Sequence, residues 1–156
     1  MDDIHFMKEA LKEAKKAFEK GEPPVGAVIV RDNEIIARGH NLRESLQDPT
    51  AHAEMMAIRA AAVRLRRWRL SDCDIYVTLE PCIMCAGAIV LARFNHLIYG
   101  AYDPKAGAVN SLMNLVSDKR FNHQVGVESG VLAEECGALL RDFFSSRRKS
   151  RSKYCC

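Results

Sequence analysis

Two short segments of the chain carry residues whose types and spacing suit metal binding. They are His52-Ala53-Glu54 and Pro81-Cys82-Ile83-Met84-Cys85. Two cysteines three positions apart at a helix start lie near the positive end of the helix dipole, which lowers their pKa and favours the thiolate that zinc requires. One imidazole and two thiolates fill three corners of a tetrahedron, and an open fourth corner is typical of a catalytic site. We therefore expect one zinc ion on His52, Cys82 and Cys85.

Glu54 stands two residues after His52, so both side chains can project toward one site. The open corner is expected to hold a water or hydroxide, because zinc lowers the pKa of its bound water to about 7. A carboxylate beside that water and shielded from solvent can carry protons to a leaving group. Glu54 is therefore the predicted catalytic residue.

Each segment alone has a less specific interpretation. Cys-x-x-Cys also occurs in redox pairs and as half of a structural zinc site. A redox pair leaves His52 and Glu54 without a role, and a four-thiolate site lacks its second Cys-x-x-Cys, because Cys155 and Cys156 are adjacent. Together the segments match the H-x-E…P-C-x-x-C signature of zinc deaminases.

The apolar pattern predicts the elements that position these segments. Helical spacing and short apolar runs indicate five helices and five strands, with a tight turn at 31–33, a loop over 40–49 and Thr50 as the N-cap of the second helix. In chain order these are helix 4–18, strands 25–30 and 34–38, helix 53–63, strand 74–79, helix 83–93, strand 96–100, short helix 111–116, strand 125–127 and helix 132–143. This order predicts an α/β fold, a three-layer α/β/α sandwich in which helices cover both faces of one mixed five-stranded sheet.

Length and composition agree with one globular domain. The chain has 156 residues, of which 48% are hydrophobic and 28% charged, close to the averages for soluble proteins. No apolar stretch approaches the ~20 residues that cross a bilayer, and the N-terminus lacks the pattern of a secretory signal. We expect a cytoplasmic protein without a membrane partner, with a zinc-dependent domain over residues 1–146 and a basic tail over 147–156.

The net charge of +3 is concentrated in that tail. Residues 147–153 hold five basic and no acidic residues, so the remainder of the chain carries −2. Such a segment fits an acidic partner such as a nucleic acid, or serves only as a solubilising terminus. A second basic cluster at 64–69 is interpreted as a solvated face.

Beyond the two motifs, most of the chain resembles the cytidine-deaminase superfamily, and more narrowly the bacterial tRNA-specific adenosine deaminases. The stretch after Gly100 is the part that points to the tRNA enzymes. The matching segments are 24–28, 48–54, 76–88, 107–115, 121–123, 130–132 and 142–144. The resemblance implies a cytidine deaminase-like fold, one zinc per subunit, and hydrolytic deamination of adenosine to inosine at the wobble position of a tRNA anticodon, with arginine tRNA expected.

The resemblance also implies partners and substrate contacts. The partners are the tRNA anticodon arm and a second copy in a homodimer. The contacts are Asn41 at the flipped base, Asp103 and Lys105 at the anticodon nucleotides, and Phe144 and Arg148 on the C-terminal helix. Asn41 also suits a simple turn, and Phe144 also suits a core position beside Phe143. Val109-Asn110 departs from the small residues expected before Ser111, which bears on the shape of the loop near the RNA.

Two other functions remain open on the sequence. A zinc deaminase acting on a free nucleobase or nucleotide, such as cytosine, cytidine or guanine, would have the same metal site, because pocket shape sets the substrate. The basic tail and the loop over 103–115 disfavour it, since a small substrate requires neither. A zinc-stabilised RNA-binding module without activity is a third interpretation, and it assigns no role to Glu54.

Overall fold

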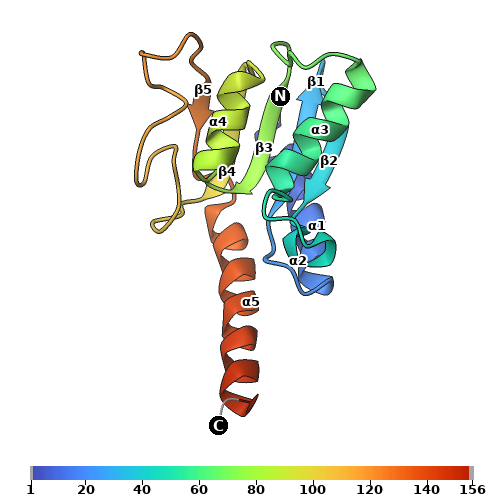
Figure 1. Cartoon of the computed structure of the whole chain (residues 1–156), viewed down its shortest axis with the longest axis vertical. Coiled ribbons are helices and arrows are strands. Elements are labelled where there is room, and N and C mark those ends of the chain that lie inside the picture. Colours follow the sequence, from blue (N-terminus) through green and yellow to red (C-terminus); the bar gives the residue numbers. More distant parts are fainter. Residues whose placement is uncertain (1, 155–156) are drawn as a thin grey trace.

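The structure, a computed structural model, describes residues 2–154. Ten elements follow one another along this part of the chain (Figure 1). They are α1 (Asp3–Glu19), β1 (Gly26–Arg31), β2 (Glu34–His40), α2 (Arg43–Leu46), α3 (Ala53–Leu65), β3 (Asp74–Leu79), α4 (Ile83–Leu91), β4 (His96–Ala101), β5 (Gly126–Glu128) and α5 (Ala133–Tyr154).

The strands form one mixed sheet in the order β2-β1-β3-β4-β5. The β1 strand is antiparallel to both of its neighbours, whereas β3, β4 and β5 run parallel. Asp32 and Asn33 connect β1 to β2 with φ angles of 50° and 63°. Two positive φ values match the twist of a tight hairpin, and Asn and Asp tolerate them better than most residues. The predicted mixed five-stranded sheet is confirmed.

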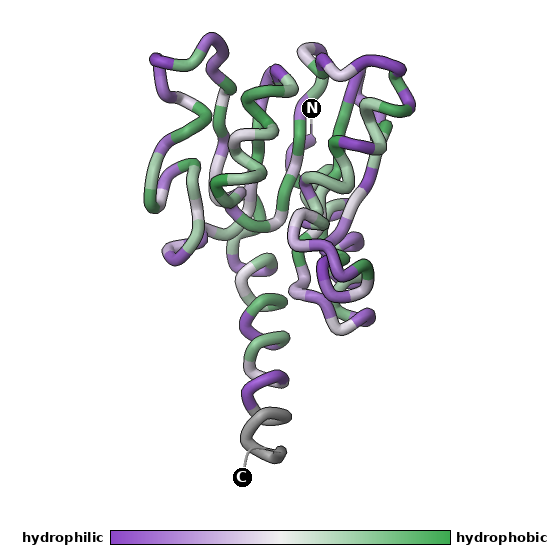
Figure 2. Tube along the Cα trace, viewed as in Figure 1, coloured by the Kyte–Doolittle hydropathy of each residue, from purple (hydrophilic) through white to green (hydrophobic). Residues whose placement is uncertain are grey.

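Helices cover both faces of the sheet, because successive strand residues alternate between two cores. In β3, Ile75 and Val77 pack in the core beneath α3 and α4, whereas Tyr76 packs in the core beneath α1 and α5. Figure 2 shows hydrophobic residues along β3 and α4 and many hydrophilic residues in the surrounding loops. The three-layer sandwich is therefore confirmed, with its apolar cores between the layers.

Three local predictions are wrong. The expected loop at 40–49 contains the short helix α2, and no helix forms at 111–116. Thr50 does not cap α3, because its amide and hydroxyl both donate to Asp48 Oδ1, and His52 occupies the cap position. In each case a side-chain carboxylate accepts hydrogen bonds from the backbone amides concerned. Glu22 accepts from amides of α2, Glu80 accepts from amides of 109–111, and Asp48 accepts from the Thr50 amide.

The basic segment continues a helix. Because α5 runs from Ala133 to Tyr154, the expected boundary at residue 146 falls inside it, and Cys155-Cys156 lies outside the described residues. The helix extends beyond the edge of the sheet (Figure 1). Arg147 contacts the body of the protein by donating from Nη2 to the carbonyl of Gly21 at 2.6 Å. Across residues 2–154, no helix combines the length and the apolar character needed to cross a membrane.

Candidate active site

The three expected metal ligands meet at the starts of two helices. His52 is the N-cap residue of α3, Cys82 is the N-cap residue of α4, and Cys85 lies in the first turn of α4. Both sulfurs are 3.6 Å from His52 Nδ1, and all three ligand atoms lie within 4.8 Å of one another. Bonds of about 2.3 Å to sulfur and 2.0 Å to nitrogen can reach one zinc ion from such a cluster. The residues present fit zinc.

Two helix N-termini face this cluster, and their dipoles favour negative charge there. The pKa of Cys82 is lowered to about 4, because the Cys85 thiol and His52 both donate hydrogen bonds to its sulfur. The hydrogen bond between the two cysteines raises the pKa of Cys85, because the Cys85 thiol is its donor, and burial of Cys85 raises this pKa further. The hydrogen bond to Cys82 likewise raises the pKa of His52. One thiolate is therefore in place at neutral pH, and a metal ion would take a second by displacing the Cys85 proton.

Glu54 lies in the first turn of α3 and is 4% exposed. Burial raises its pKa to about 7, and the charge of Cys82 adds to the effect. A positive ion on the neighbouring ligands would lower this pKa again. A buried carboxyl group at this position can both accept and return a proton, which is the requirement for general acid–base catalysis.

A cleft of about 1050 Å³ opens above the metal ligands. The structure brings almost every candidate residue into its lining, although they come from five separate parts of the chain. Those residues are Asn41, His52, Glu54, Cys82, Asp103, Lys105, Phe144 and Arg148. Cys85 is the exception, because it is completely buried beneath the cleft. The roles of the substrate-facing residues stay predictions, but their common location is a property of the fold.

The structure also bears on the alternatives for Asn41 and Phe144. Asn41 Oδ1 accepts a hydrogen bond of 3.3 Å from the Arg43 amide, as a turn residue does, while the residue still lines the cleft. Phe144 is 45% exposed on the cleft, whereas Phe143 is 4% exposed and stacks edge-on against Phe18. The core position therefore belongs to Phe143.

The sequence did not single out several residues of this region. Arg43, Tyr102 and Arg141 also line the cleft, and no spacing rule marks them, whereas Arg147, which lines it too, belongs to the predicted basic tail. Glu80, 2% exposed, also lines it. Burial alone would raise the pKa of Glu80, but hydrogen bonds from Ser111 and from backbone amides outweigh it and lower the pKa. An acidic residue between an apolar strand and Pro81 was the available signal for Glu80.

Comparison with known proteins agrees with this architecture. The profile of the cytidine and deoxycytidylate deaminase zinc-binding region matches residues 1–101, which include all three candidate ligands. The chain therefore belongs to the cytidine and deoxycytidylate deaminase family. Within it, the chain is 58% identical to the tRNA-specific adenosine deaminase of Bacillus subtilis (strain 168) over 96% of this chain and 92% of that protein. It is 51% identical to the tRNA-specific adenosine deaminase of Aquifex aeolicus (strain VF5), over 96% and 99%.

Solved structures show the same fold. One, from a study of A-to-I editing by tRNA:A34 deaminases at the wobble position of transfer RNA, superposes with a TM-score of 0.84 at 48% identity, covering 87% of this chain and 99% of the other. A guanine deaminase from Nitrosomonas europaea gives a TM-score of 0.79 at 22% identity, over 91% and 84%. The second comparison supports the cytidine deaminase-like sandwich and nothing further.

Proposed function

We propose that this protein deaminates adenosine to inosine by hydrolysis at the wobble position of a tRNA anticodon, with an arginine tRNA as substrate. The observation that carries the proposal is the lining of one cleft, where Asn41, Asp103, Lys105, Phe144 and Arg148 surround Glu54 and the metal ligands. The identity of 58% to a tRNA-specific adenosine deaminase across nearly the whole chain supports the same substrate.

The reaction replaces the 6-amino group of adenine by oxygen and releases ammonia. Zinc held by His52, Cys82 and Cys85 would supply the Lewis acidity that makes a hydroxide nucleophile available at neutral pH. Glu54 accepts the proton of the attacking water as oxygen bonds to C6. It passes that proton to ring nitrogen N1, and then carries the proton of the new C6 hydroxyl to the amino nitrogen, so that the C6–N bond breaks, ammonia leaves and the C6 carbonyl of inosine forms.

Recognition requires that the adenine leave the base stack and enter the cleft. Asn41 can both donate to and accept from a heterocycle edge, which suits a single flipped base. An exposed aromatic ring such as Phe144 can stack on a neighbouring base. Lys105 and Arg148 can neutralise phosphates on either side of it.

A deaminase of free nucleobases or nucleotides, such as cytosine, cytidine or guanine, is the second candidate, because the guanine deaminase has the same fold. The size of the cleft disfavours it. At about 1050 Å³ the cleft is at the upper end of the volumes of small-molecule pockets. A nucleobase would leave most of it empty, whereas an anticodon loop would occupy it.

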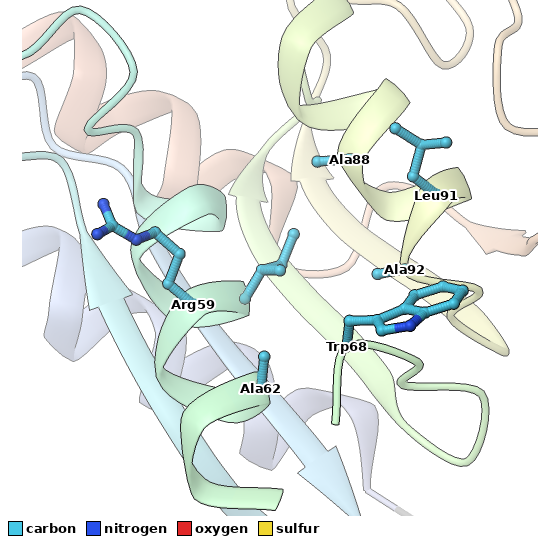
Figure 3. A pocket seen from close by; sticks show the side chains of 7 residues that line it. Arg59, Ala62, Trp68, Ala88, Leu91 and Ala92 are labelled. Carbon is cyan, nitrogen blue, oxygen red and sulfur yellow. The ribbon is translucent and has the colours of Figure 1, made fainter. Parts of the chain in front are cut away.

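A homodimer is part of the proposal, and an apolar face on α3 and α4 supports it. Trp68 and Leu91 border a pocket of about 280 Å³ on this face (Figure 3). Their side chains are 62% and 68% exposed, and a second copy of the chain would cover them. We place the enzyme in the cytoplasm, where the free thiols of Cys73 and Cys136 would stay reduced.

The experiment is inosine formation by the purified protein on an arginine-tRNA anticodon stem-loop with adenosine at the wobble position. Free adenosine, cytidine, cytosine and guanine are tested in parallel. We expect inosine from the stem-loop alone. Turnover of a free base with the RNA unchanged would overturn the proposal in favour of the second candidate.

A further inference from the structure

Glu80 is the centre of a hydrogen-bond network that no catalytic step uses. Its two carboxylate oxygens accept five hydrogen bonds, four from backbone amides and one from a hydroxyl. Oε1 accepts from the Asp103 amide at 3.0 Å and from the Ser111 hydroxyl. Oε2 accepts from the amides of Val109, Asn110 and Ser111 at 3.1, 2.8 and 2.9 Å.

These donors lie at the two ends of one loop, which we call the 103–111 loop. Asp103 begins it, and Val109, Asn110 and Ser111 end it, so one carboxylate holds both ends together. Between them, Asp103 Oδ1 accepts from the amides of Lys105 and Ala106 at 3.1 and 3.2 Å. The path of the loop therefore depends on Glu80 directly and through Asp103.

The 103–111 loop forms a wall of the cleft through Asp103, Lys105 and Ala106, while its Gly107 is buried against Glu80. A Cβ at Gly107 would overlap the Glu80 carboxyl group. The backbone at Gly107 therefore lies so close to the Glu80 carboxylate that only glycine fits. Any larger residue at 107 would displace the loop from Glu80.

Glu80 is also fixed relative to the metal ligands. It stands two residues before Cys82, and its own amide donates to the Ala101 carbonyl at 2.9 Å. The carbonyl of the intervening Pro81 accepts from the Ala108 amide at 2.8 Å. A displacement of the 103–111 loop relative to Cys82 would therefore break the hydrogen bonds of the Glu80 carboxylate and of the Pro81 carbonyl.

We propose that Glu80 is a positioning residue that holds the 103–111 loop at a set distance from the metal ligands, so that Asp103 and Lys105 meet the nucleotides beside the reacting base. This rests on the proposed function for the identity of the substrate, but the structural part does not depend on it. A carboxylate is required because all five partners are donors. A glutamine would turn an NH2 group toward some of them and leave buried amides without an acceptor.

The test compares Glu80→Gln with Glu22→Gln. Glu22 is an equally buried carboxylate that accepts three hydrogen bonds from Glu44 and Ser45, which lie in the short helix α2 and not in the 103–111 loop. Its variant controls for the general loss of a buried acceptor. Gly107→Ala disturbs the same contact from the loop side and is expected to behave as Glu80→Gln does.

Three readouts are taken on the metal-loaded full-length proteins. Zinc content should stay at one ion per chain in all variants. Trypsin cleavage after the exposed Lys105 should accelerate about tenfold or more in Glu80→Gln and Gly107→Ala, the size expected for loss of a charge-assisted hydrogen bond, and should not change in Glu22→Gln. The KM for the anticodon stem-loop should rise by a similar factor in Glu80→Gln, with a much smaller change in kcat.

The outcomes separate this proposal from the proposed function. Unchanged Lys105 cleavage in Glu80→Gln, or loss of zinc from that variant, would overturn the positioning role whatever the substrate is. Accelerated cleavage with an unchanged KM would overturn the claim that the loop serves the substrate. Failure of the wild-type enzyme to modify the stem-loop counts against the proposed function, and the cleavage and zinc results still decide the structural part.

Discussion

Two glutamates in the same cleft are almost equally buried, yet their surroundings shift their pKa values in opposite directions. Burial raises the pKa of Glu54 to about 7. Glu80 is as deeply buried, but its pKa is lowered because Ser111 and several backbone amides donate to it. A group that exchanges protons near neutral pH suits catalysis, and a permanently ionised acceptor suits the fixing of a loop. The pKa of Glu80 is shifted in the direction opposite to that of Glu54 because of the hydrogen bonds that Glu80 accepts.

Replacing Glu54 by Gln should remove the proton carrier with little change in shape. We expect kcat on the anticodon stem-loop to fall by about 100- to 10,000-fold, the range general acid–base catalysis contributes. Zinc content, thermal stability and stem-loop affinity should change little, and Glu54→Ala should give the same loss of turnover. Turnover at the wild-type rate in either variant would remove Glu54 from the mechanism.

The candidate site was predictable where its chemistry is local in sequence. His52, Cys82 and Cys85 were predicted from two short motifs, and the structure brings their ligand atoms within 4.8 Å. Glu80 was not predicted, because its partners lie 23 to 31 residues later in the chain and no spacing rule records them. The position of Phe144 was settled only by the packing of its neighbour Phe143 against Phe18.

At the scale of elements, strands and long helices followed from their apolar periodicity, whereas short elements did not. The sheet strands alternate between two cores and left a clear pattern. The apolar residues at 111–116 predicted a helix, but Glu80 draws the amides of 109–111 toward itself and gives the chain another path. The α2 helix was not predicted for a similar reason. The amides of Glu44 and Ser45 donate to Glu22, which lies more than 20 residues earlier in the sequence.

Glu22 therefore acts as a cap for α2, and its loss should show in the pH dependence of stability. Burial alone would raise its pKa, but hydrogen bonds from Ser45 and from the Glu44 amide lower it below 4.5. Its contribution is thus fully present above pH 4.5 and is lost as the pH falls through the lower pKa of the folded state. We expect Glu22→Gln to lower the free energy of unfolding by about 2 kcal/mol at pH 7.

Urea unfolding followed by circular dichroism at several pH values measures this difference. The difference in the free energy of unfolding between wild type and Glu22→Gln should become smaller as the pH falls below 4.5. Glu19→Gln, which removes an exposed carboxylate from the same region of the chain, should leave stability nearly unchanged at every pH. A difference in unfolding free energy that stays constant with pH would show that Glu22 stabilises the fold by its packing and not by its charge.

At the scale of the whole molecule, the apolar face on α3 and α4 and the cleft are separate surfaces with no lining residue in common. A dimer formed through this face would leave the cleft open. We expect Leu91→Asp to convert the dimer to monomers in light scattering at micromolar concentration, because it places a charge in an apolar contact. Ile4→Asp changes a half-exposed residue of α1 and should stay dimeric. A wild-type monomer, or a dimer that survives Leu91→Asp, would contradict this arrangement.

The basic end of the chain supplies the last test of the RNA proposal. Deleting residues 147–156 would confuse two effects, because Arg147 also donates to the Gly21 carbonyl beside the cleft. Substituting Lys149 and Arg151 by Gln removes two positive charges and keeps Arg147. If both neutralise phosphates, the slope of log K against log salt for stem-loop binding should flatten by about 1.4, or roughly 0.7 for each contact.

The matched control removes two charges from the other basic cluster, as Arg66→Gln with Arg69→Gln. We interpret that cluster as a solvated face, so its variant should keep the wild-type slope. Equal slopes for all three proteins would mean that the end of α5 only solubilises the protein, and RNA affinity would then rest on the cleft residues alone. A flatter slope in the control would instead extend the RNA-binding surface to the end of α3, on the far side of the sheet from α5.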